Sequence, residues 1–130
     1  MGGLKLVKLQ SISEIYAVLR RAVMARQPVT ALYDRRRRVF CPHRLGYTRE
    51  GEPRVLCYQS GGESKSGLKP PGSPENWRCI AVDRLQKVKP APGVWRTAPN
   101  HSRPQTCVFK VDVDADDYIS VEEIDRKDIG

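Results

Sequence analysis

Cationic side chains recur through the middle of this chain, at places where a small β scaffold would bring them together. The run Arg35–Arg38 comes first, a Pro42-His43-Arg44 step follows, and Arg78 and Arg84 stand further along. Guanidinium groups bind phosphate through two parallel hydrogen bonds and stack on bases, which ammonium groups do less well. We therefore expect a site for an anionic ligand. A charge run of this kind can also be plain solvated surface, so the run does not identify the ligand.

A glycine- and serine-rich stretch from Gly61 to Gly67 contributes Ser64, Lys65 and Ser66. Glycines allow successive backbone N–H groups to point at one anion. The stretch is not a Walker loop, because it lacks the glycine spacing before the lysine and has no Gly-Lys pair followed by Ser or Thr. It predicts either an anion-binding nest, with Ser64 and Ser66 as ligands, or a flexible hairpin loop.

The Trp77-Arg78 pair lies in the run with the clearest strand pattern. Alternation along a strand sends Trp77 and Cys79 to one face and Arg78 and Ile80 to the other. An arginine among buried neighbours is unfavourable unless it is paired or binds an anion. Arg78 is thus a strong ligand-binding candidate.

The C-terminus suggests a function of a different class. Residues 112–123 place carboxylates at positions 1, 3, 5 and 12 of an EF-hand loop, with Glu123 as the twelfth, and calcium chemistry uses such a set. Position 6 is Asp117 where glycine is usual, and the β-branched residues before the loop favour a strand over an entering helix. The alternatives are a calcium site and a solvated acidic tail.

Catalytic and metal-binding patterns are sparse. The only histidines are His43 and His101, and four cysteines (41, 57, 79 and 107) form no Cys-x-x-Cys pair and no zinc-ligand spacing. We expect free cysteines in the core, where cysteine acts as a small hydrophobe, with redox or metal roles as the alternative. We predict no cofactor and a non-enzymatic protein; a small basic nuclease using His43 is an alternative.

The net charge of +8 conceals a division along the chain. Residues 1–111 carry 21 basic and 7 acidic side chains, which gives +14, while residues 112–130 carry 2 and 8, which gives −6. A basic body favours polyanionic partners, and the acidic tail could screen that body or compete for its site.

No apolar run approaches the roughly 20 residues that span a bilayer, and no secretory signal stands out, so we expect a cytoplasmic protein that does not bind membranes.

The elements that must position these groups follow from periodicity and turn residues. We predict a helix over residues 13–26 with Ser13 as its N-cap, and strands over residues 29–33, 38–41, 54–59, 77–82, 85–88 and 107–113. Pro42 is expected to end the second strand. A helix followed by short antiparallel strands favours a small, partly open β barrel. The chain divides into an arm (1–11), this domain (12–90), and an extension with an irregular acidic tail (91–130).

Several of these residues together resemble the WYL domain, most closely its small stand-alone bacterial members, which carry a comparable glycine- and serine-rich insert. The resemblance covers about residues 12–90 and rests on Tyr33, Arg38-Val39, Pro42, Leu45-Gly46, Tyr58, Trp77-Arg78, Leu85 and Val88. It implies a mainly β fold of the Sm-like, SH3-type barrel and a ligand-sensing or nucleic-acid-binding regulatory role. Arg78 and Arg84 match basic positions that the family uses for ligands.

Two departures from the family pattern narrow what the resemblance implies. The family's namesake Trp-Tyr-Leu is here Leu56-Cys57-Tyr58. Larger members carry an upstream helix-turn-helix domain, whereas only about a dozen residues precede the first helix here, so a separate DNA-binding protein is a conceivable partner.

The sequence therefore predicts a regulatory or sensor module that captures nucleic acid or a phosphorylated small molecule, in which Tyr58 or His43 stacks on the ligand. The expected site residues are Tyr33, Arg38, His43, Arg44, Tyr58, Ser64, Ser66, Trp77, Arg78 and Arg84.

Overall fold

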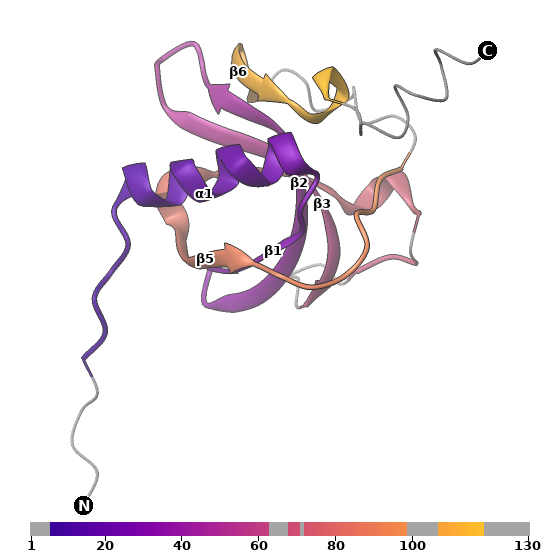
Figure 1. Cartoon of the computed structure of the whole chain (residues 1–130), viewed down its shortest axis with the longest axis horizontal. Coiled ribbons are helices and arrows are strands. Elements are labelled where there is room, and N and C mark those ends of the chain that lie inside the picture. The colour runs from indigo at the N-terminus through magenta and orange to yellow at the C-terminus, as the bar shows by residue number, and fades with distance from the viewer. Residues whose placement is uncertain (1–5, 63–67, 71, 99–106, 119–130) are drawn as a thin grey trace, which may run out of the picture.

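The computed structural model describes residues 6–62, 68–70, 72–98 and 107–118. It is mainly β, with one N-terminal helix and a six-stranded antiparallel sheet (Figure 1). The elements are α1 (Ile12–Ala25), β1 (Val29–Tyr33), β2 (Arg36–Tyr47), β3 (Pro53–Gly62), β4 (Trp77–Ala81), β5 (Leu85–Pro90) and β6 (Lys110–Asp114), with short 3-10 turns η1 (Pro74–Asn76), η2 (Val82–Arg84) and η4 (Ala115–Asp117).

Helix α1 begins at a capping box, and its N-cap lies two residues before the predicted one. Ser11, not Ser13, is the N-cap: its side chain accepts from the Glu14 backbone N–H, and the Glu14 carboxylate accepts from the Ser11 N–H. The helix ends at Arg26, whose φ of 50° is left-handed. Its buried face packs on the sheet through Ile15, Leu19, Ala22 and Val23. No helix in the described part of the chain is long and apolar enough to cross a membrane.

The connectivity of the sheet bends it back on itself. The strand order is β4-β3-β2-β1-β5, and β6 pairs with the C-terminal half of β2. The two strands at the ends of this order, β4 and β5, are joined only by the three residues of η2. The ends of the sheet must therefore lie close together, which gives it a concave inner face. Within the described ranges no ladder joins β4 to β5, so the sheet is not closed into a barrel.

Two apolar clusters fill the two sides of this bent sheet. The inner face and α1 bury the larger cluster, which includes Val29, Ala31, Phe40, Leu45, Val55, Ile80 and Val113. The outer face of β2, β3 and β4 carries a second cluster of Cys41, Leu56, Tyr58, Trp77, Ala98 and Val108, with Trp95 and Cys107 packed against it. The packed structure thus extends beyond residue 90, the predicted domain boundary.

Strand β2 is much longer than the predicted segment 38–41. It runs through Pro42, which does not end it, because the ladder with β3 is irregular between Pro42 and Arg44. A bulge is where a strand tolerates proline, since the missing N–H costs little pairing there. Further along β2, a Cβ on Gly46 would overlap the carbonyl oxygen of Lys110, so glycine allows β6 to approach.

The predicted strands over residues 29–33 and 38–41 left most of the arginine run in the turn between them, and the structure corrects this. Only Asp34 and Arg35 form the loop between β1 and β2, with φ of 52° and 63°, the geometry of a two-residue hairpin. Arg36, Arg37 and Arg38 already belong to β2. Because side chains alternate along a strand, Arg36 and Arg38 share the inner face and Arg37 lies on the outer face.

The first residues of the acidic segment are built into the fold. Asp112 accepts hydrogen bonds from the Tyr16 hydroxyl (2.7 Å) and Arg20 Nε (3.2 Å), and Asp114 accepts from Arg44 Nε (2.7 Å). Strand β6 includes the two residues before the proposed calcium loop, where the entering helix of an EF-hand would end, and the first three positions of that loop. Within the described ranges no three His, Cys, Asp or Glu side chains are placed to hold a metal. Residues 119–123 of the proposed calcium loop lie outside the described residues, so the calcium hypothesis stays a prediction.

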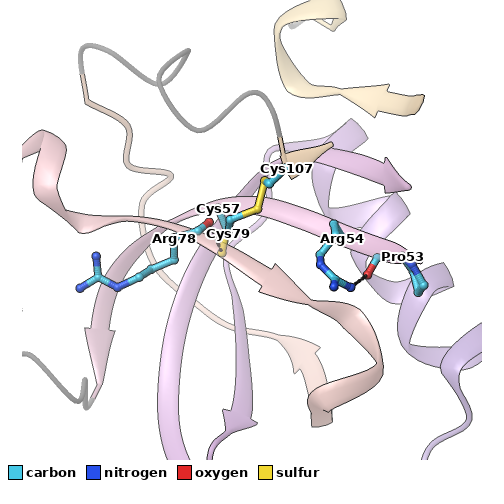
Figure 2. The surroundings of a disulfide bond; sticks show 6 residues. All are labelled: Pro53, Arg54, Cys57, Arg78, Cys79 and Cys107. Atoms are coloured by element: carbon cyan, nitrogen blue, oxygen red, sulfur yellow. Dashed lines mark hydrogen bonds between the residues drawn. A yellow bond between two sulfur atoms is a disulfide. The ribbon is translucent and has the colours of Figure 1, made fainter. Parts of the chain in front are cut away.

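The cysteines divide into two classes. Cys41 and Cys57 are free and buried as expected, and burial raises the pKa of both thiols. Cys79 and Cys107 instead form a disulfide that ties β4 to the segment preceding β6 (Figure 2), which corrects the prediction that they are free core residues. Disulfides are rare in a reducing cytosol. This bond therefore does not support the expected cytoplasmic location, which stays a prediction.

The disulfide should contribute substantially to stability because it closes a loop with a sequence separation of 28 residues. Chain-entropy arguments give about 3–4 kcal/mol for such a loop. We expect Cys107→Ser to lower the free energy of unfolding in urea by about that amount. The reducing agent dithiothreitol should destabilise the wild type equally and leave the variant unchanged. A wild type whose urea midpoint is insensitive to reduction would contradict this assignment.

Candidate anion-binding site

Tyr33 is the centre of the most concentrated charge arrangement in the described structure. The guanidinium carbons of Arg38 and Arg84 lie over its ring, 4.8 and 5.0 Å from the centroid. Arg84 also donates to the Tyr33 hydroxyl (3.3 Å) and pairs with the Asp34 carboxylate. Three predicted site residues, from β1, β2 and the end of η2, therefore meet at one place.

Arg38 is the unusual member of this group, because it is only 4% exposed. Within the described part of the chain its Nε has no hydrogen-bond partner. Burial lowers the pKa of Arg38, Asp34 and Tyr33 oppose that shift, and the charges of Arg36 and Arg78 add to it. Arginine nevertheless stays protonated in proteins. A buried cation with a free donor and cationic neighbours is poorly compensated within the protein itself.

Arg78 is a further cation whose charge acts on Arg38. In the β3–β4 ladder it lies opposite Cys57, which packs in the inner core, so β4 directs Arg78 to the inner face as alternation predicted. Its Nη1 donates to the backbone carbonyls of Glu75 (2.6 Å) and Trp77 (3.1 Å). Figure 2 shows the side chain extending away from the Cys79–Cys107 disulfide. We call four residues the arginine cluster: Arg36, Arg38 and Arg84, which adjoin Tyr33, and Arg78, whose charge acts on Arg38.

Glycine at the end of β3 allows this strand to approach the backbone of β2 beside Arg38. Gly62 lies opposite Arg38 in the β2–β3 ladder with a φ of 80°, and a Cβ there would overlap the Arg37 carbonyl and the Arg38 Cα. The first two residues of the predicted glycine loop are therefore strand residues beside Arg38. Ser64 and Ser66, the predicted ligands of that loop, lie outside the described residues.

A second basic surface lies near the same hairpin. A groove of about 390 Å3 is lined by residues of the arm, β1 and β5 together with three cations: Arg37, Lys87 and Lys89. Arg37 pairs with Leu32 in the β1–β2 ladder. The arginine run thus serves two sides of the sheet, with Arg36 and Arg38 on one and Arg37 on the other.

Apart from Tyr33, the predicted aromatic site residues lie elsewhere: Tyr58 and Trp77 belong to the second apolar cluster, and His43 packs against it. His43 is 5% exposed and sits against Trp95 (ring centroids 4.4 Å) and Trp77 (4.7 Å), with Nδ1 2.7 Å from the Cys41 carbonyl oxygen. Tyr58 is 1% exposed and packs edge-on against Trp77. Neither His43 nor Tyr58 has a free ring face for a base to stack on, and His43 is not exposed to act as a nuclease base.

Arg44 is separated from the arginine cluster as well. Its side chain is largely buried and forms the ion pair with Asp114 that joins β2 to the end of β6. Sequence reasoning had no signal for this role, because the partner lies 70 residues away. Arg36 was predicted only as part of the run Arg35–Arg38 and was not singled out as a site residue, although it pairs directly with Tyr33 across the two-residue hairpin.

No family model, curated protein or solved structure matches this chain.

The contacts of Tyr58 predict a structural role. Its hydroxyl donates to the Ser73 carbonyl (2.9 Å) and lies 3.5 Å from Asn76 Nδ2. Removing a buried hydrogen bond costs about 1–2 kcal/mol, so we expect Tyr58→Phe to lower the free energy of unfolding by that amount in urea titrations. Binding of a labelled oligonucleotide should not change. A tenfold loss of binding at unchanged stability would instead place Tyr58 in the ligand site.

Proposed function

We propose that this protein is a non-enzymatic sensor or regulatory module that binds a phosphate-bearing ligand at the arginine cluster. The observation that supports it best is the buried Arg38, whose Nε lacks a hydrogen-bond partner within the described residues. A buried cation is tolerated when it is paired and hydrogen-bonded. A phosphate would supply charge and acceptors together, since its oxygens accept hydrogen bonds from guanidinium donors.

The balance of charge around Tyr33 favours the same ligand. Four arginines contribute to the cluster, and one of them, Arg84, pairs with the Asp34 carboxylate. Arg35 adds another cation in the adjoining turn, at a positive φ where glycine would cost less. The excess positive charge would attract a polyanion over a distance and hold it through close contacts.

Nucleic acid and phosphorylated small molecules share this chemistry. A nucleic acid would extend from the arginine cluster along further cations such as Arg35, Arg37 and Lys87, whereas a small molecule would use the cluster alone.

With the sheet order described above, we also propose that the bent sheet corresponds to the Sm-like, SH3-type barrel of a WYL domain. The near approach of β4 and β5 through η2 supports this interpretation.

Arg84→Ala tests the proposal against a matched control. Arg84 and Arg49 each place a guanidinium over an aromatic ring, Arg49 over Phe109 at 4.3 Å, but Arg49 is in the turn at the far end of β2. Using anisotropy of a labelled single-stranded oligonucleotide at two salt concentrations, we expect Arg84→Ala to weaken binding about tenfold or more. Arg49→Ala should change binding less than about twofold.

The same titration separates the two ligand classes and can refute both. Displacement of the oligonucleotide by pyrophosphate at low concentration would indicate a small-molecule site, whereas steep salt dependence without such displacement would indicate extended phosphate contacts. Equal losses in Arg84→Ala and Arg49→Ala would show binding by net charge alone. Absence of binding by oligonucleotide and pyrophosphate at low salt would reject the proposal.

Arg38→Met should separate stability from binding. Replacing a buried, incompletely compensated cation by an apolar side chain of similar length removes a desolvation cost. We expect the ligand-free variant to be as stable as the wild type or about 1 kcal/mol more stable in urea, while phosphate binding is lost. A variant that is clearly less stable and binds normally would show that Arg38 serves only the fold.

A further inference from the structure

An apolar groove lies on the opposite side of α1 from the arm. Its volume is about 520 Å3, and it is lined by the exposed side of α1 together with the ends of the β2–β3 hairpin: Ile12, Ser13, Tyr16, Ala17, Arg20, Tyr47 and Pro53. The rings of Tyr16 and Tyr47 stack at 5.5 Å with an interplanar angle of 19°. The Tyr16 hydroxyl is fixed by Asp112. The groove is therefore preformed.

The arm that precedes α1 presents apolar side chains to solvent. Leu6 is 91% exposed and Leu9 is 73% exposed, and Ile12, at the start of the helix, is 51% exposed. Single exposed apolar residues are common on protein surfaces, but a contiguous group of this kind marks an interaction site. Ile12 belongs to both features, so the arm and the groove meet at the N-terminus of α1.

The arm is directed away from the groove of its own chain. The backbone N–H of Gln10 donates to the side-chain oxygen of Gln86 (3.0 Å), and the Gln86 side-chain amide donates to the Gln10 carbonyl (3.1 Å). The side-chain amide of Gln10 accepts from the Val88 N–H (2.8 Å) and donates to the Val88 carbonyl (3.0 Å). These four bonds fix residue 10 on β5. In Figure 1 the arm leaves α1 on the β5 side, away from the β2–β3 hairpin.

We propose that the groove receives the arm of a second copy of this chain, in a reciprocal two-fold dimer. Leu6 and Leu9 of each copy would occupy the groove between α1 and the β2–β3 hairpin of the other. The shared position of Ile12 suits a two-fold axis near the start of α1, because there each arm points toward its partner's groove. A two-fold contact of this kind uses the same surface twice and closes on itself.

The area that such an exchange buries decides whether it can hold a specific dimer. Leu6 and Leu9 are 91% and 73% exposed, so we expect their burial in two reciprocal contacts, with the groove surface that they cover, to reach the roughly 1,200 Å2 at which standard interfaces begin. The contact is mainly apolar, so it should persist in high salt. Association through shared polyanions at the arginine cluster would instead weaken in salt.

Sedimentation velocity of the full chain tests the proposal. The wild type should form dimers in high salt when its concentration is raised to about 100 µM. The arm variant (Leu6→Glu with Leu9→Glu) and the groove variant (Ala17→Glu) should each raise the dimer dissociation constant about tenfold or more. Val94→Glu is the matched control, because Val94 is also a highly exposed apolar residue (75%) but lies in the segment after β5. It should leave the dimer unchanged, and circular dichroism should show all variants folded.

Mixing the two variants gives the decisive result. In a heterodimer, the unchanged arm of the groove variant can enter the unchanged groove of the arm variant, so one of the two contacts is intact. In either homodimer both contacts contain a substitution. Native mass spectrometry of the mixture should therefore show a heterodimer in excess over both homodimers. A monomeric wild type, a dimer that neither variant weakens, or a mixture without heterodimer would each overturn the proposal.

Discussion

The three-residue connection η2 between β4 and β5 is the constraint on which the rest of the structure depends. It joins the two ends of the strand order, so the sheet has to bend and acquires a concave face. Helix α1 covers the apolar part of that face. Tyr33, Arg38 and Arg84 are left at the end of the β1–β2 hairpin, where β1, β2 and η2 meet. Burial of Arg38 and the convergence of the cluster both follow from this bend.

The two sides of the sheet have different roles because they are covered differently. On the inner side Arg38 is buried near other cations, and its Nε has no hydrogen-bond partner within the described residues. On the outer side Trp95 and Val108 cover His43, Tyr58 and Trp77, and the Cys79–Cys107 disulfide ties β4 to that covering segment. Aromatic groups that could have stacked on a ligand serve as core instead. If the protein has the proposed function, ligand capture would therefore depend on charge and on Tyr33.

Local patterns in the sequence predicted most elements, and long-range contacts account for what they missed. The periodicity of α1 and the β-rich run of β1 are local signals and gave bounds within a residue or two. The hairpin register that pairs Tyr33 with Arg36 was also accessible, since a two-residue loop fixes it. The continuation of β2 past Pro42 depends on a bulge opposite β3. The burial of His43 and the pairing of Arg44 with Asp114 depend on residues 95 and 114, which no local pattern links to them.

The most direct test of the anion site is the side-chain Nε–H resonance of Arg38, measured by 1H–15N NMR during titration with pyrophosphate. If a phosphate group compensates this buried guanidinium, the Arg38 signal should shift with saturation and exchange more slowly with water, and the Arg84 signal should follow the same binding curve. If other resonances report binding while the Arg38 signal stays unchanged, the ligand binds elsewhere and the account of the arginine cluster is wrong.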